Sequence, residues 1–305
     1  MNAERTLVVI GGPTASGKTT AAAAIAKQYG TEVISGDSRQ FYHAMRIGTA
    51  RPGEDELLGV RHHFLGHLEI EQIWSAGQFA REAEPVLQGA LDRSGIVALV
   101  GGSGLYLDAL TKGLDPLPTS DLRLRERLQH RLEQHGIGGM LKELEQHDPI
   151  TFQRIDHNNP HRVVRALEVC LITGKPYSAQ RTTPTNREDL RIVRIAMDVK
   201  REALYQRIDA RVDRMIADGL VDEARSLLPH RELNALRTVG YRELFEHFDG
   251  RCTLDEAIAL IKQHTRNYAK RQMTWLRRDG DWQWIRPEDH TAMVSAIDAA
   301  RQDQT

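Results

Sequence analysis

The chain has 305 residues, of which 40% are hydrophobic, and carries a formal net charge of −1. This length suits one large domain, or one domain with an insertion, and the near-neutral charge excludes a protein that coats nucleic acid through overall positive charge. Its two cysteines lie far apart, which excludes a disulfide framework and a cysteine-based zinc module. We therefore expect a reducing, cytoplasmic setting.

The N-terminal part of the chain predicts neither a signal peptide nor a membrane anchor. The apolar run 7–10 is too short for a signal sequence and leads directly into a glycine-rich motif. No stretch approaches the roughly 20 apolar residues of a membrane span, so we expect a soluble protein. The adjacent His62 and His63 should point in different directions, and a structural role is favoured over a metal site for both.

Short apolar runs predict the strands of a parallel sheet. Several of these runs are rich in β-branched residues and do not alternate apolar with polar residues, which is typical of strands buried on both faces. A helix is predicted from about Lys18, and strands alternate with helices. This order predicts an α/β protein with a P-loop-type three-layer fold. The predicted strands are 6–10, 31–35, 95–100 and 192–197.

The segment 118–189 has a different character and predicts a helical insertion domain. Asn159 and Pro160 begin one of its helices as N-cap and first residue, and Gly174 ends it. Residues 181–187 have the composition of a linker. The catalytic core is then 1–117 together with 190–305, which includes a long C-terminal helix at 254–278. The helices predicted in the insertion are 121–135, 139–147 and 160–173.

A phosphate-binding loop follows the first predicted strand. Its sequence fits G-x-x-x-x-G-K-[ST] between a strand and a helix, the context that this motif requires. Backbone N–H groups and the helix N-terminus face phosphate oxygens in such a loop, and Lys18 adds a positive charge. The Thr19 hydroxyl suits a Mg²⁺ ligand, so Mg²⁺ is the expected cofactor. Candidate diphosphate or nucleotide ligands are Gly12, Pro13, Thr14, Ala15, Ser16, Gly17, Lys18 and Thr19.

The loop alone leaves the reaction open. The strand 95–100 ends in Gly-Gly-Ser-Gly instead of the acidic residue of a Walker-B strand. A small-molecule kinase and a transferase that holds pyrophosphate both fit. Asp37 directly follows the second strand and should lie near the loop, because ligands bind at the carboxyl ends of parallel strands. A general base and a helix N-cap are equally favoured for it.

Eight motifs in this order resemble the bacterial tRNA dimethylallyltransferases, also called tRNA isopentenyltransferases. The resemblance extends from about residue 7 to residue 278, and the ordered set is far more specific than any single motif after the loop. The motifs are Gly12-Pro-Thr-Ala-Ser-Gly-Lys-Thr19, Asp37-Ser-Arg-Gln40, Ile47-Gly-Thr-Ala50, His62-His-Phe64, Gly101-Gly-Ser-Gly-Leu-Tyr106, His161-Arg-Val-Val-Arg165, Arg237-Thr-Val-Gly-Tyr-Arg242 and Lys270-Arg-Gln-Met-Thr-Trp275.

The resemblance implies a reaction. Dimethylallyl diphosphate is the donor, and the acceptor is N6 of the adenosine immediately 3′ of the anticodon, in tRNAs that read codons beginning with U. The products are N6-isopentenyladenosine and pyrophosphate. Two positions depart from the family, which more often has Thr at Ser103 and a branched aliphatic at Phe41. Ser103 keeps the hydroxyl of Thr, so we expect its polar contact to be kept. Eukaryotic relatives carry a C-terminal zinc finger, which we do not expect in this chain.

The resemblance also implies roles for individual residues. Asp37 is the expected general base, and Lys18 and Thr19 are catalytic through the diphosphate. Arg207 and Arg211, spaced i and i+4, either face the diphosphate or form salt bridges on their own helix, for example with Asp209 or Asp213. Expected tRNA contacts are Asp37, Ser38, Arg39, Gln40, Ser103, Arg125, His161, Arg162, Val163, Val164, Arg165, Arg237, Thr238, Val239, Gly240, Tyr241, Arg242, Lys262, Arg266 and Lys270.

Some of these expected contacts have a structural alternative. Val163 and Val164 belong to an apolar set that favours the core of the insertion. Lys262, Arg266 and Lys270 recur every four residues, which predicts one basic stripe on the C-terminal helix. We expect a monomer that binds the tRNA anticodon stem-loop and no membrane. The alternatives are a P-loop kinase of a nucleoside or small metabolite, and a non-catalytic RNA-binding protein.

Overall fold

The computed structural model describes residues 5–115, 117–181, 187–278 and 280–302. The chain divides into two compact units, one formed by Met1–Thr111 with Arg187–Thr305 and the other by Lys112–Asn186. The insertion predicted at 118–189 overlaps this second unit. Most of the predicted linker, residues 182–186, lies outside the described residues.

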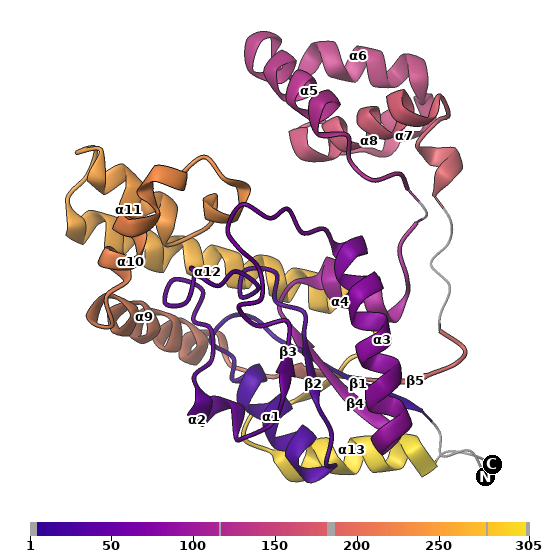
Figure 1. The fold of residues 1–305 in the computed structure, drawn as a ribbon, viewed down its shortest axis with the longest axis vertical. Coiled ribbons are helices and arrows are strands. Elements are labelled where there is room, and N and C mark those ends of the chain that lie inside the picture. The colour runs from indigo at the N-terminus through magenta and orange to yellow at the C-terminus, as the bar shows by residue number, and fades with distance from the viewer. Residues whose placement is uncertain (1–4, 116, 182–186, 279, 303–305) are drawn as a thin grey trace. The chain divides into compact units, whose positions relative to one another are not determined.

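The first unit is built on a parallel sheet of six strands (Figure 1). The strand order is β3-β2-β4-β1-β5-β6, so β1 lies at the centre between β4 and β5. The predicted α/β fold with a parallel sheet is confirmed, whereas β3 and β6 have only two and three residues and no apolar run that predicts them. The strands are β1 (Thr6–Gly11), β2 (Val33–Ser35), β3 (His62–His63), β4 (Ile96–Gly101), β5 (Arg191–Met197) and β6 (Gln283–Ile285).

Alternate side chains of the central strands face two helical layers. Val9 belongs to the core that contains Phe79, whereas Val8 belongs to the core that contains Ile25. This arrangement follows from the period of two in a strand, and it explains why the strands read as continuous apolar runs. Helices α1 (Lys18–Gln28) and α13 (His290–Gln302) contribute to one core; α3 (Ala76–Ser94), α4 (Gly104–Thr111) and α12 (Leu254–Arg278) contribute to the other.

Most of the other helices of the first unit follow β5 in the sequence. Helix α12 begins with a capping box, because the Thr253 hydroxyl accepts from the Glu256 N–H while the Glu256 carboxylate accepts from the Thr253 N–H. Among the described residues, none of the helices is both long and apolar enough to cross a bilayer. The remaining α-helices are α2 (Glu54–Leu57), α9 (Arg201–Ala217), α10 (Leu220–Leu227) and α11 (Tyr241–Phe248).

The second unit consists of helices around its own small core. Leu128, Leu144 and Leu167 are buried at its centre, and the structure shows no strand in the part of this unit that it describes. The predicted N-cap Asn159 accepts from the Arg162 N–H. The short helix α7 was not predicted. The helices are α5 (Leu122–His135), α6 (Ile137–His147), α7 (Pro149–Arg154) and α8 (Pro160–Thr173).

Candidate active site

The phosphate-binding loop connects β1 to α1, and two of its residues have a backbone conformation that L-amino acids rarely adopt. Gly17 has φ 87° and Ala15 has φ 62°, both in the left-handed region. A non-glycine residue there costs roughly 1–2 kcal/mol, so the fold must hold Ala15 in place. A Cβ at Gly12 would lie 2.5 Å from the Ser16 hydroxyl, which explains the first glycine of the motif.

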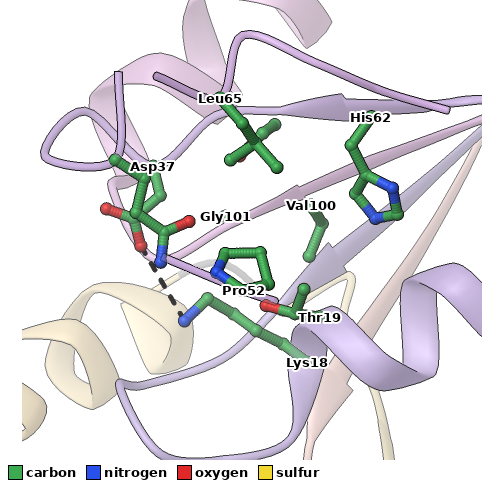
Figure 2. A pocket seen from close by; sticks show the side chains of 10 residues that line it. Lys18, Thr19, Asp37, Pro52, His62, Leu65, Val100 and Gly101 are labelled. Carbon is green, nitrogen blue, oxygen red and sulfur yellow. Dashed lines mark ion pairs between the residues drawn. The ribbon is translucent and has the colours of Figure 1, made fainter. Parts of the chain in front are cut away.

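The loop places a buried cation beside a carboxylate. Lys18 is 8% exposed, and its ammonium lies 3.9 Å from the Asp37 carboxylate at the end of β2 (Figure 2). Burial lowers the pKa of Lys18, the negative charge of Asp37 opposes that shift, and the positive charge of Arg211 adds to it. Burial also lowers the pKa of Arg211, and the negative charges of Glu56 and, to a smaller extent, Asp37 oppose that shift. One buried cation, Lys18, and one half-buried cation, Arg211, near the Asp37 carboxylate favour an anionic ligand here.

These residues line a small pocket with a polar side and an apolar side. Figure 2 shows Lys18, Thr19 and Asp37 below and beside the side chains of Pro52, Leu65 and Val100. The chemistry of this lining suits a ligand with an anionic head and a short hydrocarbon tail. Its lining comprises Lys18, Thr19, Ser35, Asp37, Gln40, Pro52, His62, Leu65, Val100 and Gly101.

The pair His62 and His63 occupies strand β3. His63 pairs with Glu32 at 2.6 Å, whereas His62 lines the pocket, which the sequence analysis did not predict. The Nδ1 atom of His62 lies 3.0 Å from the carbonyl oxygen of Val60, and burial lowers the pKa of His62. The neutral ring therefore donates through Nδ1 and directs an acceptor, Nε2, to the interior. The only signal for His62 in the sequence was its place in the His62-His-Phe64 motif, which assigns it no role.

The segment after β2 supplies Asp37 without forming a helix. Residues 38–53 contain no helix in the structure, so the helix N-cap alternative for Asp37 was wrong. Ser38 and Ser103 approach to 3.2 Å between their hydroxyl oxygens, which brings the ends of β2 and β4 together. The hydroxyl of Tyr268 on α12 interacts with Ser103, and burial together with the charge of Asp37 raises the pKa of Tyr268 to about 12. Tyr268 was not predicted as a site residue.

Two other residues of the Asp37 motif bind backbone groups. The Gln40 amide donates to the carbonyls of Thr49 and Ala50, so those two donors are already satisfied. The Arg39 guanidinium donates to the carbonyls of Asn234 and Ala235. Both residues therefore shape the rim of the site, although Gln40 also lines the pocket.

Arg207 and Arg211, which the sequence predicts on one helix, lie in different environments in the structure. Arg211 lies close enough to Lys18 and Asp37 to affect their electrostatics, whereas Arg207 is exposed. Neither forms the intrahelical salt bridges considered as the alternative. Asp209 and Asp213 pair instead with the Arg266 and Lys262 side chains of α12.

The three residues of the predicted basic stripe on α12, Lys262, Arg266 and Lys270, therefore differ in their charge partners. Lys262 lies 2.6 Å from Asp213, and Arg266 pairs with Asp209, so both positive charges have a carboxylate partner on α9. Lys270 is exposed, and the described residues offer it no ion pair. Spacing alone places residues on one helix face, but it does not reveal which face packs against another helix.

Several residues predicted to contact RNA are buried. Val163 and Val164 lie in the core of the second unit, which agrees with the core role that the sequence analysis favoured over RNA contact for this apolar set. Tyr241 is fully buried, and its hydroxyl donates to Glu223 at 2.7 Å; Gly240 is also buried. In the motifs 161–165 and 237–242, the exposed residues are His161, Arg162, Arg237 and Arg242. Thr238 and Val239 are half-buried.

Arg125 and Arg165 in the second unit share one buried acid. Glu168 is fully buried, and its carboxylate accepts from Arg125 at 3.1 Å and from Arg165 at 2.8 Å. Both guanidinium groups remain partly exposed. A buried carboxylate between them offsets their mutual repulsion and fixes their orientation.

Close packing of α12 against the turn after β4 explains one glycine of the Gly-Gly-Ser-Gly sequence. A Cβ at Gly104 would lie 2.1 Å from the indole of Trp275. We expect Gly104→Ala to destabilise the protein by about 1–3 kcal/mol, because neither ring nor backbone can move freely. Chemical denaturation measures this change. Gly89→Ala is the control, since its Cβ would meet only a flexible arginine end; equal stability of both variants would contradict the packing account.

The comparisons with known proteins decide the family. The model of the IPP transferase family matches residues 40–279, which is most of the chain. The chain belongs to the IPP transferase family. A protein of Christiangramia forsetii named tRNA dimethylallyltransferase is 44% identical over 94% of this chain and 95% of its own length. A relative of the same name from Bacteroides fragilis, numbered 1, is 42% identical over 97% of this chain and 98% of its own.

Solved structures of the IPP transferase family share the fold. The crystal structure of the full-length tRNA isopentenylpyrophosphate transferase from Bacillus halodurans matches with a TM-score of 0.70 and 34% identity, over 97% of this chain and 98% of that one. A eukaryotic dimethylallyltransferase acting on tRNA matches with a TM-score of 0.79 and 26% identity, over 97% of this chain and 77% of that one. The kinase alternative is therefore not favoured for this IPP transferase family member.

Proposed function

We propose that this protein transfers the dimethylallyl group of dimethylallyl diphosphate to N6 of the adenosine immediately 3′ of the anticodon, in tRNAs that read codons beginning with U. The product is N6-isopentenyladenosine, and pyrophosphate leaves. The observation that supports this reaction best is the position of Asp37, 3.9 Å from the buried ammonium of Lys18 in one pocket. A carboxylate beside a phosphate cradle can accept a proton where the diphosphate departs.

The cradle stabilises the leaving group. Breaking the allylic C–O bond places negative charge on pyrophosphate, and the loop N–H groups, Lys18 and Arg211 lie where that charge develops. Because Lys18 is buried, little water screens its charge, and its effect on the transition state is large.

The Thr19 hydroxyl fits a role in binding Mg²⁺. It lines the same pocket as the carboxylate of Asp37, and hydroxyl, carboxylate and phosphate oxygens are the ligands that Mg²⁺ prefers. Within the described residues no group of three or more His, Cys, Asp or Glu forms a metal site of its own, so the substrate phosphates would supply the other ligands. Bound Mg²⁺ would neutralise charge on the departing pyrophosphate.

Asp37 acts as the general base in this proposal. The adenine N6 is a weak nucleophile because its lone pair is delocalised into the ring, and a hydrogen bond to a carboxylate strengthens it. The adenine must leave its stack to reach the pocket, which anticodon-loop bases do readily. The paired hydroxyls of Ser38 and Ser103 lie beside Asp37 at the ends of neighbouring strands and can hydrogen-bond the base edge.

The apolar side of the pocket suits the prenyl chain. Pro52, Leu65 and Val100 line the same pocket as Lys18 (Figure 2). A cation-like allylic carbon formed there is shielded from water, which would otherwise compete with the adenine as nucleophile.

RNA binding should depend on the unpaired part of the α12 stripe. We expect Lys270→Ala to lower the slope of log affinity against log salt by about one, because one phosphate contact is lost. Lys262→Ala should leave that slope nearly unchanged, because Asp213 already neutralises Lys262. Filter binding of an anticodon stem-loop between low and high salt measures both slopes. Equal changes for the two variants would mean that the ion pairs on α9 open when RNA binds.

The reaction is tested by identifying its product. Unmodified anticodon stem-loops, with adenosine or guanosine 3′ of the anticodon, are incubated with dimethylallyl diphosphate and Mg²⁺ and then digested to nucleosides. We expect N6-isopentenyladenosine and one equivalent of pyrophosphate from the adenosine substrate and no product from guanosine. An unmodified adenosine stem-loop after long incubation would reject the proposal.

We also propose that the protein acts as a monomer in the cytoplasm. Both cysteines are free thiols in the structure, Cys170 buried and Cys252 half-buried, which suits a reducing compartment.

A further inference from the structure

Gln272 of α12 reaches into the catalytic edge of the sheet from the far end of the sequence. Its side-chain carbonyl accepts from the Thr14 N–H of the phosphate-binding loop at 2.9 Å. Its amide group donates to the Gly102 carbonyl, in the turn after β4, also at 2.9 Å. The side chain is 5% exposed, so neither bond competes with bulk water. One residue therefore joins the diphosphate cradle to the turn that carries Ser103.

The sequence of that turn leaves room for this bridge. A Cβ at Gly102 would lie 2.2 Å from the Gln272 amide nitrogen and 3.2 Å from the carbonyl oxygen of Gly12. Any other residue at position 102 would displace the glutamine or the loop. Gly104 makes space for Trp275 in the same way, three residues further along α12 from Gln272. Two glycines of the Gly-Gly-Ser-Gly sequence are thus explained by side chains of one helix.

We propose that Gln272 is a positioning residue of the transfer reaction, which holds the phosphate-binding loop in its diphosphate-binding shape before the substrate arrives. This inference rests on the proposed function. The loop contains Ala15 in the left-handed region, a conformation that a free loop would leave. The bond from Thr14 acts one residue before Ala15. Because Gln272 is buried, bulk water does not replace its side chain as the acceptor. A pre-formed cradle binds its ligand without the cost of ordering the loop.

The test compares Gln272→Met with Gln263→Met. Methionine keeps the volume of glutamine and removes both hydrogen bonds, while Gln263 is an exposed glutamine of the same helix and serves as the matched control. Pyrophosphate binding with Mg²⁺ is measured by calorimetry on the full-length protein. We expect Gln272→Met to weaken pyrophosphate binding about tenfold, equivalent to ~1.4 kcal/mol, and the control to match the wild type.

Kinetics separate positioning from general stability. The Michaelis constant for dimethylallyl diphosphate should rise about tenfold in Gln272→Met with little change in turnover, since the lost interaction serves bound substrate and transition state alike. Gln272→Asn, whose shorter amide cannot span both partners, should show the same pattern if the methionine variant folds poorly. Unchanged pyrophosphate affinity and Michaelis constant in a folded variant, even with a lower melting temperature, would overturn the inference.

The calorimetric measurement also separates this inference from the proposed function. Pyrophosphate binding needs no RNA and no prenyl transfer, so a weaker Gln272→Met variant supports the positioning role whatever the acceptor is. A wild-type protein that binds pyrophosphate but modifies no stem-loop would reject the proposed reaction alone.

Discussion

Asp37→Asn is expected to lower the rate of prenyl transfer by about 10²- to 10⁴-fold, the usual range for loss of a general base. Asparagine keeps the size of the side chain and can still accept a hydrogen bond from N6, but it cannot take the proton. Affinity for the stem-loop should remain close to that of the wild type. Replacing the charged Asp37 beside Lys18 by a neutral residue adds no electrostatic repulsion toward the RNA phosphates. Single-turnover transfer at saturating donor and RNA measures the rate, and filter binding measures the affinity.

The control for Asp37 is another aspartate of the same unit. Asp92 pairs with Arg5, and its side chain is 72% exposed, so Asp92→Asn removes an acid without touching the site. Its transfer rate should equal that of the wild type. If Asp37→Asn also retained near-normal transfer, the carboxylate would have no part in proton removal, and the assignment of Asp37 would be abandoned.

Lys18→Met is expected to lower transfer by about 10²- to 10³-fold, the range found when one preorganised charge-stabilising group is removed. The ammonium is nearly buried in the loop, so no water can substitute for it fully. Turnover should fall together with donor affinity, because in the proposed reaction the lysine would contact the diphosphate before and during bond cleavage. Steady-state kinetics with varied dimethylallyl diphosphate measures both effects.

Lys27→Met provides the matched control for this variant. Lys27 lies in the last turn of the same helix, α1, and is exposed. It carries the same charge without facing the pocket, so transfer should be unchanged. Equal losses for Lys18→Met and Lys27→Met would show that overall charge, and not the cradle, sets the rate.

The main features of the fold were predictable because they depend on local patterns. The runs 6–10 and 95–100 are buried on both faces and therefore read as continuous apolar sequence, and β1 and β4 are found there. Asn159 and Gly174 mark the ends of α8 by capping, which acts within one turn of helix. The short strands β3 and β6 were missed because so few residues carry no periodicity.

The site was only partly predictable, because much of it depends on contacts between distant segments. The loop, Lys18 and Asp37 follow from strand ends and a motif, and the structure brings them together. Gln272 and Tyr268 were missed, since nothing in a long basic helix indicates which residues turn toward the sheet. The same cause explains why the burial of Tyr241 was not predicted, because it depends on packing against the distant residue Glu223.

The central claim is that the phosphate-binding loop holds a prenyl diphosphate and not a nucleotide that donates phosphate. The most direct test incubates the protein with Mg²⁺, an unmodified anticodon stem-loop and dimethylallyl diphosphate carrying a radioactive label in its prenyl group, without ATP. We predict label on the stem-loop at the adenosine 3′ of the anticodon. No label on the RNA, together with transfer of the γ-phosphate of ATP to a nucleoside or small metabolite in a parallel reaction, would contradict the claim.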